Sequence, residues 1–159
     1  MNIMPDSLTW VTGSGNEVLF DEISKQINDM SINEGRVFIG TDSNIVGEKC
    51  IFATAICLHK EGYGGKYFFV RSKHPTKSFS NLFQRMVTEV EKSVLTAVAV
   101  SEKNPSAEIE IHLDIGKSKR SKTRFFIDTL TGYAKSAGFD CKIKPYAWAS
   151  ASVADKHSK

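Results

Sequence analysis

Several features that define large protein classes are missing from this sequence. No stretch of its 159 residues approaches the roughly 18 consecutive apolar residues that a membrane helix needs, and the first residues lack a basic start followed by an apolar run. The three cysteines, Cys50, Cys57 and Cys141, are odd in number and form no Cys-x-x-Cys motif or Cys/His cluster. This pattern indicates neither a disulfide framework nor a zinc site. We therefore expect a soluble, cytoplasmic protein that has no membrane association.

The composition indicates one folded domain with an N-terminal extension. Hydrophobic residues make up 41% of the chain, which suits a compact core, and no repeat or interdomain linker interrupts it. Apolar residues recur at helical spacing over residues 16–30 and predict an amphipathic helix behind a loosely held terminus. We therefore divide the chain into an extension, residues 1–35, and a main domain, residues 36–159.

The main domain alternates strand-like and helical patterns in an order that defines a fold class. The strand-like runs are residues 36–43, 49–60, 66–71, 108–115 and 139–145. Helical spacing covers residues 80–100, 121–137 and 149–159. Three antiparallel strands followed by a βαβαβ half predict an α/β fold with a mixed five-stranded sheet and helices on both faces, because parallel strands need helical crossovers.

Two aspartates stand at matching ends of predicted strands. Asp42 ends the first strand of the main domain, and Asp114 ends the fourth. If these strands are neighbours, about 4.8 Å apart, both carboxylates reach one hard cation. Either residue alone is an ordinary turn former. Crowding both would raise one pKa unless a cation neutralised them, so the pair favours Mg²⁺ or Mn²⁺.

Further acids come from two helices, and the pattern leaves alternatives open. Glu89 and Glu91 lie on opposite flanks of the apolar stripe of the long helix, and helical geometry does not separate them. Asp155 and His157 lie in the last helical segment, and either completes the site if that segment folds back over the sheet.

A basic loop follows Asp114. Residues 116–124 contain five positive side chains and no acid, namely Lys117, Lys119, Arg120, Lys122 and Arg124. Beside metal ions such a loop attracts phosphate, whereas elsewhere on the surface it is an ordinary solvated charge run. The net charge of +3 does not by itself indicate nucleic acid, so the position of the loop matters.

Three segments together resemble one known family. They are Phe38-Ile39-Gly40-Thr41-Asp42-Ser43, then His112-Leu113-Asp114-Ile115-Gly116 with Lys122-Thr123-Arg124, and Lys142-Ile143-Lys144-Pro145 with Ala151-Ser152-Val153-Ala154-Asp155. The combination is similar to the YkuK-like family of the ribonuclease H-like superfamily, over about residues 36–159. The resemblance implies a ribonuclease H-like fold, and Leu82 with Thr88-Glu89 favours Glu89 over Glu91.

The resemblance also implies a chemistry. The superfamily's four acids fall on Asp42, Glu89, Asp114 and Asp155, which would hold two Mg²⁺ or Mn²⁺ ions for hydrolysis of a nucleic-acid phosphodiester. His157 and Glu91 would be auxiliary. The five residues of the basic loop would hold the nucleic-acid backbone.

Two other functions compete with this one. A non-catalytic module would keep the fold and the basic loop and only bind nucleic acid or protein. Nucleotide-dependent phosphotransferases that share the sheet need two such domains, and this chain has neither the second domain nor a Gly-rich phosphate loop. The sequence does not distinguish RNA, DNA, hybrid or branched substrates, because phosphate contacts carry no base information. It leaves the oligomeric state open.

Overall fold

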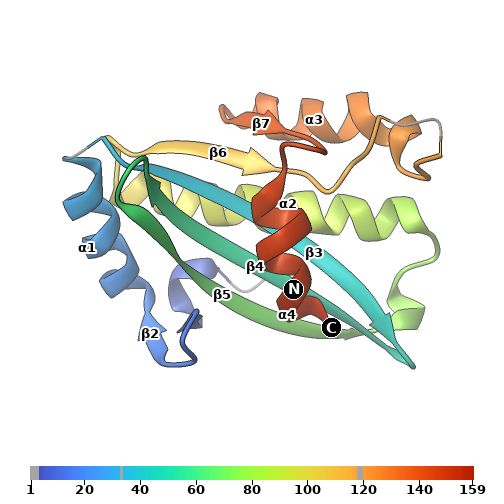
Figure 1. Cartoon of the computed structure of the whole chain (residues 1–159). Coiled ribbons are helices and arrows are strands. Elements are labelled where there is room, and N and C mark those ends of the chain that lie inside the picture. Colours follow the sequence, from blue (N-terminus) through green and yellow to red (C-terminus); the bar gives the residue numbers. More distant parts are fainter. Residues whose placement is uncertain (1–3, 33, 118–119) are drawn as a thin grey trace.

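A mixed seven-stranded sheet organises the chain (Figure 1). The computed structural model describes residues 4–32, 34–117 and 120–159. The strands are β1 (Thr9–Thr12), β2 (Glu17–Leu19), β3 (Arg36–Val46), β4 (Lys49–Lys60), β5 (Gly64–Pro75), β6 (Glu108–His112) and β7 (Asp140–Lys142). The helices are α1 (Phe20–Ser31), α2 (Leu82–Lys103), α3 (Ile127–Ser136), a π-helix (Ala149–Ala154) and α4 (Asp155–Ser158), with short 3₁₀ turns at Pro5–Ser7, Thr76–Ser78 and Arg124–Phe126.

The order of the strands confirms the predicted fold class. They lie in the sequence β2-β1-β5-β4-β3-β6-β7, with β3, β4 and β5 as antiparallel neighbours and β6 and β7 parallel to β3. The parallel strands follow α2 and α3, as helical crossovers require. In the part of the chain that the structure describes, no helix is long and apolar enough to cross a bilayer.

The N-terminal segment differs from its prediction. Residues 9–12 and 17–19 form a hairpin that pairs with β5, so the sheet has seven strands and not five. Trp10 is fully buried and donates to the carbonyl oxygen of Pro5 at 3.0 Å, so residues 5–12 are not loosely held. Residues 17–19 belong to the hairpin, and α1 therefore begins at Phe20 rather than at residue 16. Strands of three and four residues are too short to show a period of two in the sequence.

Helices cover one face of the sheet. Alternate residues of β3, such as Val37 and Ile39, join a core with side chains from α1, α2 and α3. On the same face Thr41 hydrogen-bonds Ser93 of α2, with 2.7 Å between their hydroxyl oxygens. The predicted helix over residues 121–137 is shorter than expected, because residues 124–126 form a 3₁₀ turn before α3.

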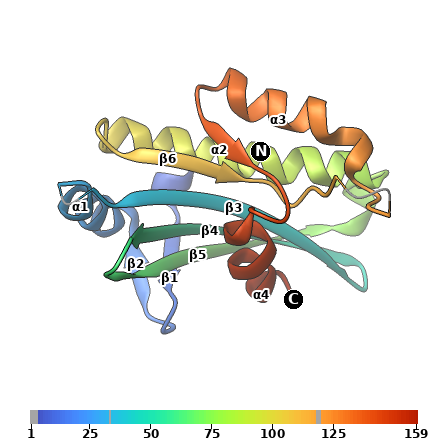
Figure 2. The same cartoon turned by 45° about the horizontal axis from the view of Figure 1, so that its top comes forward.

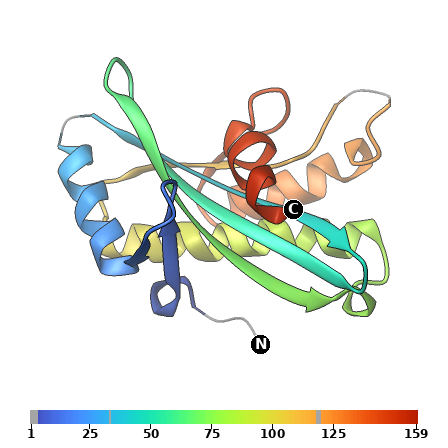
Figure 3. The same cartoon turned by 60° about the horizontal axis from the view of Figure 1, so that its bottom comes forward.

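The C-terminal segment, residues 146–158, covers the opposite face. It crosses β3 and β4 on the side away from α2 (Figures 2 and 3). Phe38, Ala55 and Cys57 form a small core with Ala149 and Ala154 of this segment. The last helix therefore folds back over the sheet, which is the condition under which Asp155 or His157 could complete the site.

Gly40 allows the C-terminal segment to come this close. A Cβ atom built on Gly40 would lie 2.4 Å from the backbone nitrogen of Ser150 and 2.7 Å from the carbonyl carbon of Ala149. Trp148 packs on Phe38 with ring centroids 4.9 Å apart. The backbones of β3 and the segment are therefore in direct contact, which places residues 155–158 above the second half of β3.

A buried polar chain holds the start of the same segment. The backbone N–H of Ala149 donates to His112 Nδ1 at 3.0 Å, so the proton of the ring is on Nε2, which donates to Glu110 at 2.9 Å. Glu110 also pairs with Arg36 at 3.3 Å. Burial lowers the pKa of His112, against the opposing effect of Glu110, and keeps the ring neutral. Glu110 and His112 of β6 are thus buried.

Gly40→Ala should destabilise the protein by about 2 kcal/mol, because the new methyl group displaces backbone rather than a flexible side chain. Gly132→Ala is the matched control, since no atom lies within 4 Å of a Cβ there and the residue is inside α3. The control should gain about 0.5 to 1 kcal/mol from helix propensity. Urea unfolding measures both, and equal or higher stability of Gly40→Ala would contradict the tight approach.

Candidate active site

The strand register places three charged residues in one row. Gly40 of β3 pairs with His112 of β6, and His112 pairs with Lys142 of β7. Two residues further along each parallel chain stand Asp42, Asp114 and Lys144. Hydrogen bonds from Leu113 N to Lys142 O and from Lys144 N to Ile115 O, both 2.9 Å, continue the pairing beyond the strand ends. The two aspartates are therefore neighbours, as their sequence positions predicted.

Asp42 is buried among other acids. Only 7% of the residue is exposed, and its Oδ2 accepts a hydrogen bond from Ser158 Oγ at 3.0 Å. Burial raises the pKa of Asp42 to about 7, with the negative charge of Asp114 as the next largest cause and hydrogen bonding to Asp114 and Asp155 adding to it. A cation beside Asp42 would reverse this effect.

Glu89 reaches the site from the other face of the sheet. Ser43 lies on the α2 side of β3, and its hydroxyl donates to Glu89 Oε2. Glu89 is 4% exposed, and burial raises its pKa well above the ordinary value, partly opposed by Ser43 and increased by the charges of Asp42 and Asp114. Glu91 is only half-buried. Glu89 therefore interacts electrostatically with the two aspartates. The helical pattern alone did not distinguish the two glutamates.

Asp114 carries an ion pair. Its Oδ1 lies 2.8 Å from the ammonium of Lys144, which is about half-exposed. The hydrogen bond to Asp114 raises the pKa of Lys144, and the charges of Asp114, Asp42 and Asp155 add to this. The ammonium is therefore a fixed positive charge at physiological pH.

The C-terminal segment supplies the fourth acid. Asp155 contributes to the raised pKa of Asp42 and pairs with Lys159 at 3.2 Å. His157 turns to a different neighbourhood, where its ring stacks on Phe69 with 3.6 Å between centroids and Nε2 lies 3.0 Å from the hydroxyl of Tyr67. His157 therefore anchors α4 on β5, while Asp155 and Ser158 face β3.

Comparison with known proteins decides the family. A family model described as Ribonuclease H-like matches residues 18–159. The chain belongs to the ribonuclease H-like family. It is also 25% identical to the "Uncharacterized protein YkuK" of Bacillus subtilis (strain 168), over 98% of this chain and 100% of that protein. No solved structure matches the chain. The resemblance read from the sequence motifs is thereby confirmed.

In this ribonuclease H-like chain, the acidic centre (Asp42, Glu89, Asp114 and Asp155) suits a hard cation by donor type and charge. All its donors are carboxylate oxygens, and burial of Asp42 beside Asp114 favours a neutralising ion. As the side chains stand, however, the described residues contain no group of three or more His, Cys, Asp or Glu arranged to hold a metal. Protein donors, namely Ser43, Ser158, Lys144 and Lys159, contact the four carboxylates instead.

The basic loop, residues 116–124, follows Asp114 of the acidic centre in the chain. Lys117, Arg120 and Lys122 are exposed, and Arg124 is half-buried. Lys119 lies outside the described residues. The guanidinium of Arg124 lies 4.5 Å from the ring centroid of Phe125, an exposed aromatic side chain. Lys117 follows Asp114 by only three residues, so the loop begins beside the acids.

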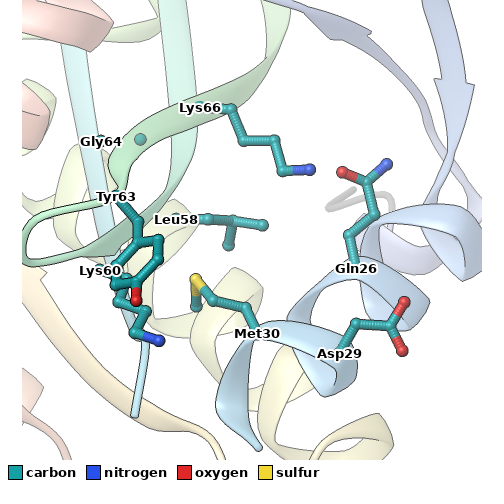
Figure 4. A pocket seen from close by; sticks show the side chains of 9 residues that line it. Gln26, Asp29, Met30, Leu58, Lys60, Tyr63, Gly64 and Lys66 are labelled. Carbon is teal, nitrogen blue, oxygen red and sulfur yellow. The ribbon is translucent and has the colours of Figure 1, made fainter. Parts of the chain in front are cut away.

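A pocket of about 570 Å³ lies elsewhere on the molecule, between α1 and the hairpin of β4 and β5 (Figure 4). Leu58 and Met30 form its base, and the side chain of Lys66 extends across it toward Gln26. Leu58 pairs with Val37 at the start of β3, whereas Asp42 lies toward the end of that strand. The pocket therefore takes no part in the acidic centre.

Sequence reasoning missed the partners of the acids. Ser43, Ser158 and Lys144 each contact one carboxylate, and none was a candidate site residue. Ser158 and Ser43 give no sequence signal, since serine is common on surfaces. Lys144 gives one: once β7 is placed beside β6, two residues after each strand come Lys144 and Asp114.

Asp42→Asn should stabilise the metal-free protein at pH 8, in EDTA, by about 2 kcal/mol or more. The folded-state pKa of Asp42 is raised from 3.8 to about 7, so the folded chain keeps a proton that the unfolded chain releases between these values. Wild-type stability therefore falls as pH rises from about 4 to 7, by up to about 1.4 kcal/mol per pH unit. The variant lacks this loss.

The measurement is urea unfolding of both proteins at pH 4.5 and pH 8. Asp140→Asn, at an exposed aspartate of β7, is the control and should change stability little at either pH. An Asp42→Asn variant that loses the same stability at both pH values would show that Asp42 is not crowded by like charge.

Proposed function

We propose that this chain is a divalent-metal-dependent nuclease that hydrolyses nucleic-acid phosphodiesters. One observation carries the proposal: Asp42 and Asp114 stand side by side on adjacent parallel strands, with Glu89 and Asp155 brought to them from opposite faces of the sheet. Like charges that are buried together destabilise a protein unless a bound cation neutralises them. Such clusters are typical of functional sites.

The acids would hold Mg²⁺ or Mn²⁺, and the family resemblance implies two ions. Asp42 is central, because its pKa responds to both Asp114 and Asp155, while Glu89 and Asp114 flank it. A bound ion supplies Lewis-acid activation of water and stabilises charge on the leaving oxygen. The chain itself positions these oxygens through Ser43 and Ser158, each of which donates a hydrogen bond to one acid.

The basic loop would bind the substrate backbone. Lys117 and Lys122 are exposed in the loop that begins three residues after Asp114, and they would pair with phosphates as point charges. Arg124 is held against Phe125, which leaves an aromatic face beside positive charge. This combination suits a nucleic-acid strand of either sugar type and does not specify a sequence.

A non-catalytic binding module is the second candidate. The observation in its favour is that Ser43, Ser158 and Lys144 already satisfy three of the acids without a metal. Such a module would keep the basic loop and bind nucleic acid without cutting it.

Cleavage in the presence of Mn²⁺ separates the two candidates. Wild-type protein should cut at least one member of a panel of labelled RNA, DNA, hybrid and branched substrates. Asp114→Asn should lose at least about 100-fold in rate, because it removes one charge of the acidic centre. Asp140→Asn should keep full activity. Binding without cleavage by wild-type protein, or equal rates for wild type and Asp114→Asn, would favour the non-catalytic module.

The double variant Lys117→Ala/Lys122→Ala should weaken nucleic-acid binding uniformly across sequences. Each lost phosphate contact should reduce the slope of log affinity against log salt by about 0.9 on duplex and about 0.7 on single strands. Titration at several salt concentrations measures the slope, and Lys25→Ala/Lys49→Ala, at exposed lysines of α1 and β4, is the control. An unchanged slope would mean that the loop does not touch phosphate.

A further inference from the structure

Lys144 brings a positive charge into the acidic centre by the same geometry that brings the acids together. Its ammonium lies 2.8 Å from Asp114 Oδ1, and Asp114, Asp42 and Asp155 all interact with it. Among the described residues, Lys159 also pairs with an acid of the centre, but it is the last residue, and 64% of its side chain is exposed. Lys144 is the better fixed of the two.

The backbone holds Lys144 in register with Asp114. Leu113 donates to the carbonyl oxygen of Lys142, and Lys144 donates to that of Ile115, both at 2.9 Å. These bonds extend the parallel pairing of β6 and β7 on both sides of Asp114. The two Cα atoms are thus fixed relative to each other by the sheet.

This ion pair changes the charge that the acidic centre offers to metals. Asp42, Glu89 and Asp155 carry negative charge that one divalent cation would neutralise, whereas the Lys144 ammonium already neutralises Asp114. A second cation at Asp114 would have to displace this ammonium or accept its repulsion at close range. An ammonium is also a compact point charge that binds phosphate oxygens directly.

We propose that the Lys144 ammonium replaces a second metal ion, so that the chain binds one divalent cation and presents Lys144 to the phosphate of the substrate. This inference rests on the proposed nuclease function. It makes Lys144 a residue that contacts substrate and holds Asp114, with the single ion at Asp42.

Counting bound Mn²⁺ tests the inference without any substrate. The electron paramagnetic resonance signal of free Mn²⁺ disappears on binding, so a titration gives the number of ions per chain. Wild type should bind one ion, and Asp42→Asn should bind at least tenfold more weakly. Lys144→Met should bind two, with the affinity for the second ion at least tenfold higher than in wild type. Lys144→Arg should bind one.

Lys142→Met is the matched control, because it removes a lysine only two residues before Lys144, and no ion pair of Lys142 with an acid of the centre occurs among the described residues. This variant should bind one ion. Circular dichroism checks the fold, and Lys144→Gln is the second neutral variant if Lys144→Met does not fold. Two tightly bound ions in wild type would overturn the inference and leave the proposed function intact. So would a count of one in both neutral variants. No Mn²⁺ binding by wild type would overturn both.

Discussion

The central constraint on this structure is an unfavourable interaction, the electrostatic repulsion among carboxylates that the fold brings together. Asp42 and Asp114 meet because β3 and β6 are parallel and in register, and Asp155 arrives because the C-terminal segment docks on Gly40. The raised pKa of Asp42, about 7, follows from this crowding and from burial. Other contacts balance it: Ser43, Ser158 and Lys144 each bring a donor to one acid. The centre is thus stabilised locally while its net charge still favours a cation.

Much of the fold was readable from the sequence because its elements are long and periodic. The meander of β3, β4 and β5, the helix α2 and the parallel strand β6 all carry strong apolar patterns, and the strand order follows from right-handed crossovers. The hairpin of β1 and β2 was missed, because strands of three and four residues have no measurable period. Its burial of Trp10 is a tertiary effect that no local pattern contains.

The positions of Asp42 and Asp114 were predictable because each ends a recognisable strand, whereas the rest of the centre needed three-dimensional structure. Glu89 and Glu91 are equivalent on a helical wheel, and only the position of Ser43 relative to α2 separates them. Lys144 becomes visible only when β7 is paired with β6. His157 was a candidate site residue because it is titratable and lies near Asp155 in the sequence. In the structure its side chain packs on Phe69 and Tyr67 and anchors α4.

The most direct test of the central claim is anomalous diffraction from crystals of the wild-type protein grown with Mn²⁺. The account predicts an anomalous peak within coordination distance of a carboxylate oxygen of Asp42, about 2 to 2.5 Å, while the Lys144 ammonium stays on Asp114. Crystals soaked in excess Mn²⁺ that show no ion at Asp42, with the carboxylates of Asp42 and Asp114 turned apart, would contradict it.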